Sequence, residues 1–163
     1  MPTPESSHIV LVNPEIPQNT GNIARLCAAT SSTLHLVGRI GFSLDEKAVR
    51  RAGLDYWHLV QVHTHVSFEE CLGAIGGPPP LLFSSRATRN YLQAPYKKGN
   101  ILVFGAESVG LPECILEQWP DHQFGIPTIS QSVRSLNLAN SVAIALYKSL
   151  EMTGALEQYI LAP

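Results

Sequence analysis

The stretch Ile101-Leu-Val-Phe-Gly-Ala-Glu-Ser-Val-Gly-Leu-Pro112 passes from a wholly apolar run through a glycine-bounded turn to a proline. Four consecutive apolar residues are typical of a parallel strand covered on both faces. Pro112 favours the first turn of a short helix that follows. Gly105 and Gly110 allow the backbone to approach a ligand closely, and Glu107 lies in the middle of the turn. A solvated glutamate in a tight turn is the simpler alternative.

Short apolar runs of the same kind recur along the chain and alternate with segments of helical spacing. The apolar runs predict strands at 8–12, 34–37, 59–62, 81–83, 101–104 and 123–126. Capping residues, glycine stops and apolar periodicity predict helices at 19–30, 46–52, 67–75, 112–116 and 136–152. This alternation favours an α/β fold with a mainly parallel sheet flanked by helices. We expect residues 1–163 to form a single domain.

The overall charge of the chain does not indicate a polyanion-binding protein, because the formal net charge is −2. Of the 11 Lys and Arg residues, only Arg134 and Lys148 follow Gly99. Positive charge is therefore concentrated in the first two thirds of the chain, where basic residues could contact a phosphate backbone locally. The three cysteines form no Cys-x-x-Cys pair, which favours apolar packing in a reducing compartment. No apolar run approaches the roughly 18 residues of a membrane span. We therefore expect a cytoplasmic protein without membrane contact.

Two histidines share one face of an extended segment. His63 and His65 have the alternating spacing that two metal ligands on a strand require. No third ligand lies near them in the sequence, so we expect no metal.

The segment after the first predicted strand, Asn13 to Arg25, is a second candidate loop. Asn19 or Thr20 is expected to cap the helix that follows. The guanidinium of Arg25 offers five donors in a fixed fork, which suits a phosphate or a carboxylate. Taken alone, this segment favours an ordinary capped helix with a surface arginine.

A third polar loop, 126–135, leads into the long helix predicted at the chain's carboxyl end. Asn137, Asn140 and Ser141 lie in the first turns of that helix, where asparagine is unfavourable unless it has a partner. These side chains are expected to hold a ligand or a neighbouring loop, or else only to satisfy the backbone.

Other basic residues could contact a phosphate backbone. Arg86 and Arg89 follow the strand predicted at 81–83, at its ligand-facing end. Lys47, Arg50 and Arg51 form a helical stripe that ranks below them, because such stripes are usually just solvated.

Together these loops resemble the motifs of the SPOUT, or trefoil-knotted, RNA methyltransferases of the SpoU branch. The resemblance is strongest to the small type that methylates the wobble-position ribose of tRNA. It extends from His8 to about Met152 and is carried by 14–27, 51–56, 104–107 with 110–112, and 134–140. It implies an α/β knot with a C-terminal trefoil knot, S-adenosylmethionine as cofactor, tRNA as substrate, and a homodimer formed through the helices at the two chain ends.

The resemblance also implies roles for individual residues. Arg25 would lie beside the 2′-hydroxyl, with Glu107 and Asn140 orienting it. The cofactor pocket would be formed by Ser85, Gly105, Leu111, Ile126, Ser135 and Leu136. RNA would be contacted by Asn19, Arg86, Arg89 and Arg134. Two alternatives remain: methylation of another tRNA or rRNA ribose, and a module that binds cofactor or RNA without catalysis.

Overall fold

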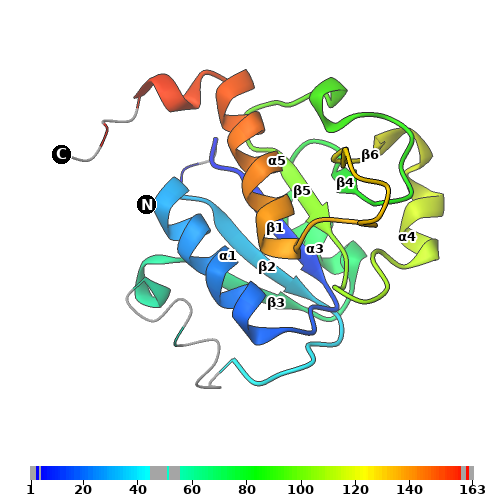
Figure 1. Cartoon of the computed structure of the whole chain (residues 1–163). Coiled ribbons are helices and arrows are strands. Elements are labelled where there is room, and N and C mark those ends of the chain that lie inside the picture. Colours follow the sequence, from blue (N-terminus) through cyan, green and yellow to red (C-terminus); the bar gives the residue numbers. More distant parts are fainter. Residues whose placement is uncertain (1–2, 4, 45–50, 52–55, 159–160, 162–163) are drawn as a thin grey trace.

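Six parallel strands form one sheet in the computed structural model, which describes residues 3, 5–44, 51, 56–158 and 161 (Figure 1). Their order across the sheet is β3-β2-β1-β5-β4-β6. The strands are β1 (His8–Val12), β2 (Thr33–Val37), β3 (Val62–His65), β4 (Leu81–Phe83), β5 (Ile101–Phe104) and β6 (Gln123–Phe124). The predicted α/β architecture with a mainly parallel sheet is confirmed.

Helices cover both faces of the sheet. On one face, α1 (Pro17–Thr30) and α5 (Leu138–Met152) pack side by side, as Figure 1 shows. On the other face lie α3 (Phe68–Ile75) and the short α4 (Glu113–Gln118). The central strands are buried on both sides, which is why their sequences are continuously apolar. The face of α5 predicted to be apolar is buried at Val142, Ala145, Leu146, Ser149 and Leu150.

The strand predictions are confirmed for the buried strands and wrong at one edge. The predicted strands 8–12, 81–83 and 101–104 match β1, β4 and β5, and β2 begins one residue before the predicted 34–37. The apolar run 59–62 is not a strand: Trp57–Leu59 form a 3-10 turn and β3 begins at Val62. β3 is an edge strand whose middle residues are exposed, so it lacks the apolar run of a covered strand. β6 ends at Phe124, before the predicted 126.

Helix boundaries follow the capping signals with one exception. Ser67 caps α3 as predicted, because its Oγ accepts a hydrogen bond from the backbone N–H of Glu70 at 3.1 Å. Asn137 caps α5, which therefore begins two residues after the predicted 136. The cap predicted at Asn19 or Thr20 is wrong, because α1 begins at Pro17 and both residues are buried inside its first turn. The helix predicted at 46–52, with Lys47 and Arg50, lies outside the described residues except for Arg51.

Two further expectations concern the cysteines and the absence of a membrane span. Cys27 and Cys71 pack in the core as predicted, whereas Cys114 is exposed, on α4. Within the described residues, no helix combines the length and apolar character that crossing a bilayer requires.

Candidate active site

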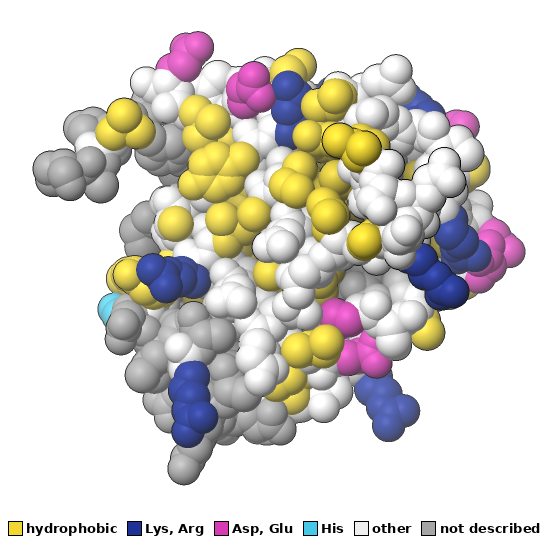
Figure 2. Space-filling view, viewed as in Figure 1, with side chains coloured by type: hydrophobic (Ala, Val, Ile, Leu, Met, Phe, Trp, Pro, Cys, Tyr) yellow, Lys and Arg dark blue, Asp and Glu magenta, His cyan; other side chains and the backbone are white. Residues whose placement is uncertain are grey.

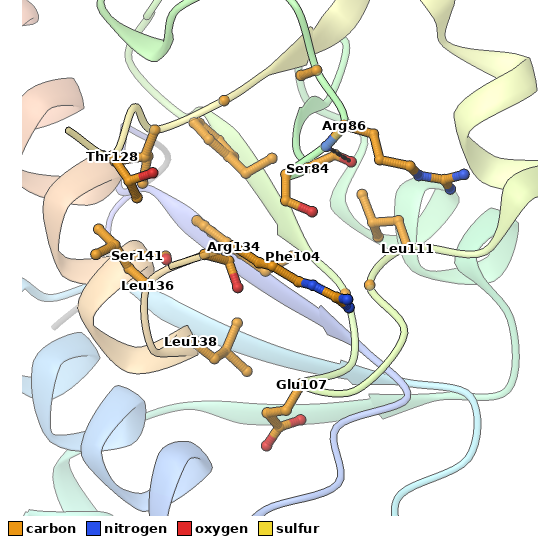
Figure 3. Close-up of a pocket in the computed structure, with 18 of the residues that line it drawn as sticks. Ser84, Arg86, Phe104, Glu107, Leu111, Thr128, Arg134, Leu136, Leu138 and Ser141 are labelled. Atoms are coloured by element: carbon orange, nitrogen blue, oxygen red, sulfur yellow. Dashed lines mark hydrogen bonds between the residues drawn. The ribbon is translucent and has the colours of Figure 1, made fainter. Parts of the chain in front are cut away.

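A cavity of about 570 Å³ opens where β4, β5 and β6 end (Figure 3). Its walls are the segments 83–90, 104–111 and 125–128, which follow these strands, and residues from 134 to 141 at the start of α5. Ligands bind at this edge of open parallel sheets because the loops after the strands meet there. All six residues predicted to bind the cofactor line the cavity: Ser85, Gly105, Leu111, Ile126, Ser135 and Leu136.

The cavity combines an apolar floor with polar loop backbone. The rings of Phe83 and Phe104 stack with centroids 4.9 Å apart at the ends of β4 and β5. Both line the cavity, together with Leu111 and Leu136. The turn after β4 is held by Oγ of Ser84, which accepts from the backbone N–H of Arg86 at 3.2 Å. Both the volume and this mixed lining fall within the usual range for small-molecule sites, about 300–1,000 Å³.

Gly105 is required by the shape of the loop after β5. Ala106 and Gly110 form an antiparallel bridge, which brings the backbone of Gly110 and Leu111 against Gly105. A Cβ added at Gly105 would lie 2.1 Å from the carbonyl carbon of Gly110, and backbone cannot move aside as a flexible side chain can. The bridge therefore closes only with glycine at this position.

We expect Gly105→Ala to weaken by about tenfold or more the binding of S-adenosylmethionine, the cofactor that the resemblance implies, because the clash opens the loop that forms one wall of the cavity. Isothermal titration of S-adenosylmethionine into the two proteins measures this loss. Gly73→Ala is the matched control, since a Cβ there meets nothing within 4 Å. Equal affinities in Gly105→Ala and the unaltered protein would contradict this role for the loop.

Glu107 points away from the cavity and toward the start of α1 (Figure 3). Its Oε1 accepts the backbone N–H of Glu15 at 2.9 Å, and its Oε2 accepts that of Ile16 at 2.7 Å. Ile16 is the N-cap of α1 and makes no side-chain cap of its own, so this remote carboxylate supplies the negative charge that a helix N-terminus favours. Glu107 therefore holds the helix that carries Arg25.

Glu15 in turn binds Ser108, the neighbour of Glu107. Its Oε1 accepts from both the backbone N–H of Ser108, at 2.9 Å, and the Ser108 hydroxyl, at 2.6 Å. These two hydrogen bonds lower the pKa of Glu15. The loop after β5 and the loop after β1 are thus joined in both directions.

Asn19 connects the same network to the start of α5. Its Nδ2 donates to Oε2 of Glu107 at 3.2 Å, and its Oδ1 accepts from Nδ2 of Asn137 at 3.0 Å. Asn19 is buried and both ends of its amide are engaged, so it positions the loops around it, and its RNA contact stays a prediction. Asn140 is exposed, and its backbone N–H donates to the Asn137 side chain. Asn137 thus makes the link between these loops, and the orienting role of Asn140 stays a prediction.

Arg25 does not line the cavity of its own chain. It is exposed on α1, and its guanidinium carbon lies 4.8 Å from the centroid of the Tyr56 ring. This cation–π contact fixes the side chain on the outer surface of the helix.

The other arginines predicted to contact RNA differ in whether a partner within the chain already engages their side chains. Arg86 turns outward from the cavity and pairs with Glu113 on α4 at 2.9 Å (Figure 3). Arg89 donates to the carbonyl of Asp121 at 2.7 Å and lies over the Phe124 ring. Arg134 extends across the mouth of the cavity, and among the described residues it forms no ion pair (Figure 3). Arg134 is therefore the arginine best placed to contact a ligand at this site.

Sequence reasoning missed the network that joins the three loops. Glu15 and Ser108 looked like ordinary loop residues, since their contacts span more than 90 positions of the chain. No signal in the sequence indicated the network, because Asn19 and Thr20 offered a local cap, and only the structure shows that α1 begins without one and needs a cap from elsewhere.

Comparison with known proteins places this arrangement in a family. The family model for the SpoU rRNA Methylase family matches residues 6–147. A tRNA (cytidine(34)-2′-O)-methyltransferase of Methylovorus glucosotrophus is 43% identical over 142 residues, covering 86% of this chain and 92% of that protein. A protein of the same name from Aeromonas hydrophila is 43% identical over 147 residues, covering 90% and 94%.

Solved structures agree with the sequence relatives. One, from work on the 2-OH methylation of C/U34 on tRNA, is 42% identical, has a TM-score of 0.84 and covers 93% of this chain and 99% of its own. A second, the SpoU methyltransferase AviRb from Streptomyces viridochromogenes in complex with AdoMet, is 19% identical with a TM-score of 0.79. It covers 91% of this chain and 60% of its own, and at this identity the likeness concerns the fold alone. By sequence and by fold, the chain belongs to the SpoU rRNA methylase family.

Proposed function

We propose that this protein transfers a methyl group from S-adenosylmethionine to the ribose 2′-hydroxyl of the wobble nucleotide, position 34, of tRNA. The observation that carries the proposal is the joining of the three loops, through Glu107, Asn19 and Asn137, at the edge of one cavity. The names of relatives that match along nearly their whole length support this substrate.

The cavity residues fit S-adenosylmethionine by their chemistry. Leu111 and Leu136 offer apolar walls, and the backbone at Gly105 and Ile126 offers hydrogen-bonding groups at close approach. When bound, the cofactor supplies a methyl group on a positively charged sulfur, which is already a good leaving group. The protein is then required mainly to align the acceptor oxygen with that methyl group.

Arg25 is proposed to bind a phosphate of the RNA and to polarise the ribose 2′-oxygen. A guanidinium is a poor proton acceptor because arginine stays protonated in proteins, so its role is electrostatic. Glu107 and Asn19 fix the helix that bears Arg25, and Asn137 fixes the loop beside the cofactor.

A homodimer is proposed to complete the site. Hydrophobic side chains gather over α5 in Figure 2, where Tyr147 and Met152 are 45% and 56% exposed. Pairing of two chains through α1 and α5 would cover this surface, and would let Arg25 of one protomer approach the cavity of its partner. The family membership also supports a C-terminal trefoil knot. Sedimentation equilibrium tests the dimer, and a monomer at micromolar concentration would contradict it.

The proposed reaction is tested by methyl transfer to a tRNA transcript with a cytidine or uridine at position 34. We expect one methyl group per tRNA, located at nucleotide 34 by mass spectrometry. The control is the same RNA with a 2′-deoxyribose at position 34, which lacks the acceptor oxygen and should stay unmethylated. Methylation of the deoxy control, or of ribosomal RNA in its place, would contradict the wobble assignment. No transfer to any RNA would indicate a module without catalysis.

Arg134→Ala is expected to raise the Kd for tRNA about fivefold to tenfold and to change the Kd for S-adenosylmethionine much less, because the side chain lies at the mouth of the cavity. The loss of one phosphate contact should also reduce the salt slope of binding by about 1. Fluorescence anisotropy at several salt concentrations measures both quantities. Arg86→Ala is a matched comparison, since Arg86 is already paired with Glu113 and should matter less. An unchanged salt slope in Arg134→Ala would argue against a phosphate contact.

A further inference from the structure

Four histidines lie on one face of the half of the sheet that is remote from the cofactor cavity. His8 is on β1, His35 on β2, and His63 and His65 on β3. The strand register sets His35 opposite His63. His35 is central: its Nε2 lies 3.0 Å from Nδ1 of His8, and its Nδ1 lies 3.0 Å from Nε2 of His65.

Cys71 adds a thiol to this group from the helix above it. It lies on α3, is fully buried, and packs against the same face of the sheet. One ligand atom each from His35, His65 and Cys71 lies within 4.8 Å of the other two. Zinc bonds of about 2.0–2.3 Å to nitrogen and sulfur place the ligands of one tetrahedral ion roughly 3.3–3.6 Å apart. Small side-chain rotations would therefore bring the three atoms to this spacing.

The hydrogen bonds of the histidines suit coordination. A neutral His35 that donates from Nε2 to His8 keeps a lone pair on Nδ1, which faces His65. Metal-bound histidines generally donate their second ring N–H in this manner. Burial raises the pKa of the Cys71 thiol to about 12, so an ion must displace its proton.

We propose that His35, His65 and Cys71 form a binding site for one Zn²⁺ ion. Two imidazoles and one thiolate are the borderline-soft ligand set that Zn²⁺ prefers. His65 lines a shallow groove of about 480 Å³ together with Gly38, Thr64 and Glu70, which gives the ion a path from solvent and leaves room for a water in the fourth position. The site joins β2, β3 and α3, so the ion stabilises the edge of the sheet, away from the loops around the cofactor cavity.

The sequence concealed this site because its ligands are scattered. His65 lies on β3, two residues from His63, but His35 and Cys71 reach it only through strand pairing and the packing of α3. The expectation of no metal rested on the lack of a third ligand for His63 and His65 nearby in sequence, whereas the fold brings two other ligands, His35 and Cys71, to His65.

The test is a titration of Zn²⁺ into metal-free full-length protein. Calorimetry measures the binding, and thermal unfolding measures its effect on stability. We expect one ion per chain and a melting temperature that rises with the Zn²⁺ concentration. Co²⁺ is a second probe, because a Co²⁺–thiolate bond gives a near-ultraviolet absorption band that nitrogen ligands alone do not. Cys71→Ser and His65→Gln should each weaken binding by about a hundredfold and should abolish or shift that band.

Two controls separate this site from unspecific binding. Cys114→Ser and His58→Gln remove an exposed cysteine and an exposed histidine elsewhere, and both should bind Zn²⁺ as the unaltered protein does. His65 is only half-buried, so His65→Gln should remain folded even if Cys71→Ser disturbs the core. Absence of stoichiometric binding would overturn the proposal and leave a hydrogen-bonded chain of neutral imidazoles. Binding that survives in His65→Gln would also overturn it.

Discussion

Arg25→Ala is expected to lower the rate of methyl transfer by about a hundredfold to a thousandfold while leaving the affinity for S-adenosylmethionine nearly unchanged. The side chain is exposed on α1 and lies outside the cofactor cavity, so its removal should not disturb the cavity walls. The rate of methyl transfer should fall instead because the 2′-oxygen of the RNA would lack the charge proposed to polarise it. Losses of about 10²–10³ are typical when one preorganised donor is removed from a reaction centre. Single-turnover kinetics with saturating cofactor measures the change.

Arg25→Lys tests whether Arg25 acts through the paired donors of its guanidinium or through its positive charge alone. Lysine keeps the charge but cannot make the paired hydrogen bonds of a planar guanidinium, so we expect it to recover less than a tenth of the lost rate. Tyr56→Leu keeps Arg25 and removes the ring beneath it, and a loss of less than tenfold should follow. Near-normal turnover in Arg25→Ala would exclude the proposed role of this residue.

The sequence predicted the centre of the sheet better than its edge. β1 and β5 are covered by helices on both faces, and this burial gives them continuous apolar runs that predict strands. β3 pairs on one side only and carries the polar run Val62-His-Thr-His65, which gives no such signal. The neighbouring apolar run was therefore assigned to the strand by mistake.

The cavity could be located from sequence because it depends on local patterns. Gly105 and Ile126 each lie just after a strand, and Leu111 lies at the far end of the loop that Gly105 begins. The end of a strand can be predicted from the residues around it. The contacts that join the loops could not be predicted in the same way. The hydrogen bond from Asn137 to Asn19 spans 118 positions, and either amide alone is equally compatible with a solvated helix end. Such pairs become visible only when the strand order is known.

Glu107→Gln is expected to lower both the stability of the protein and its rate of methyl transfer. The carboxylate accepts three hydrogen bonds, from Glu15, Ile16 and Asn19. A glutamine amide has one acceptor oxygen, and its NH₂ group would meet a donor at the other position. We expect the free energy of unfolding to fall by about 2 kcal/mol, and the melting temperature by about 4–8 °C. Methyl transfer should fall about a hundredfold, because α1 and its Arg25 lose their fixed position.

Glu5→Gln is the matched control, since the Glu5 side chain forms an exposed ion pair with Lys98, outside α1 and α5, and should change stability by less than about 1 kcal/mol. Glu107→Asp adds a second comparison: it keeps the charge but shortens the side chain, so it cannot reach both N–H groups at the start of α1. If negative charge at the helix N-terminus were the whole effect, Glu107→Asp would restore most of the stability and the rate. If geometry decides, Glu107→Asp should recover part of the stability but little of the rate, because the position of Arg25 depends on both hydrogen bonds to the backbone. A Glu107→Gln protein with unaltered melting temperature and rate would contradict any linking role for this carboxylate.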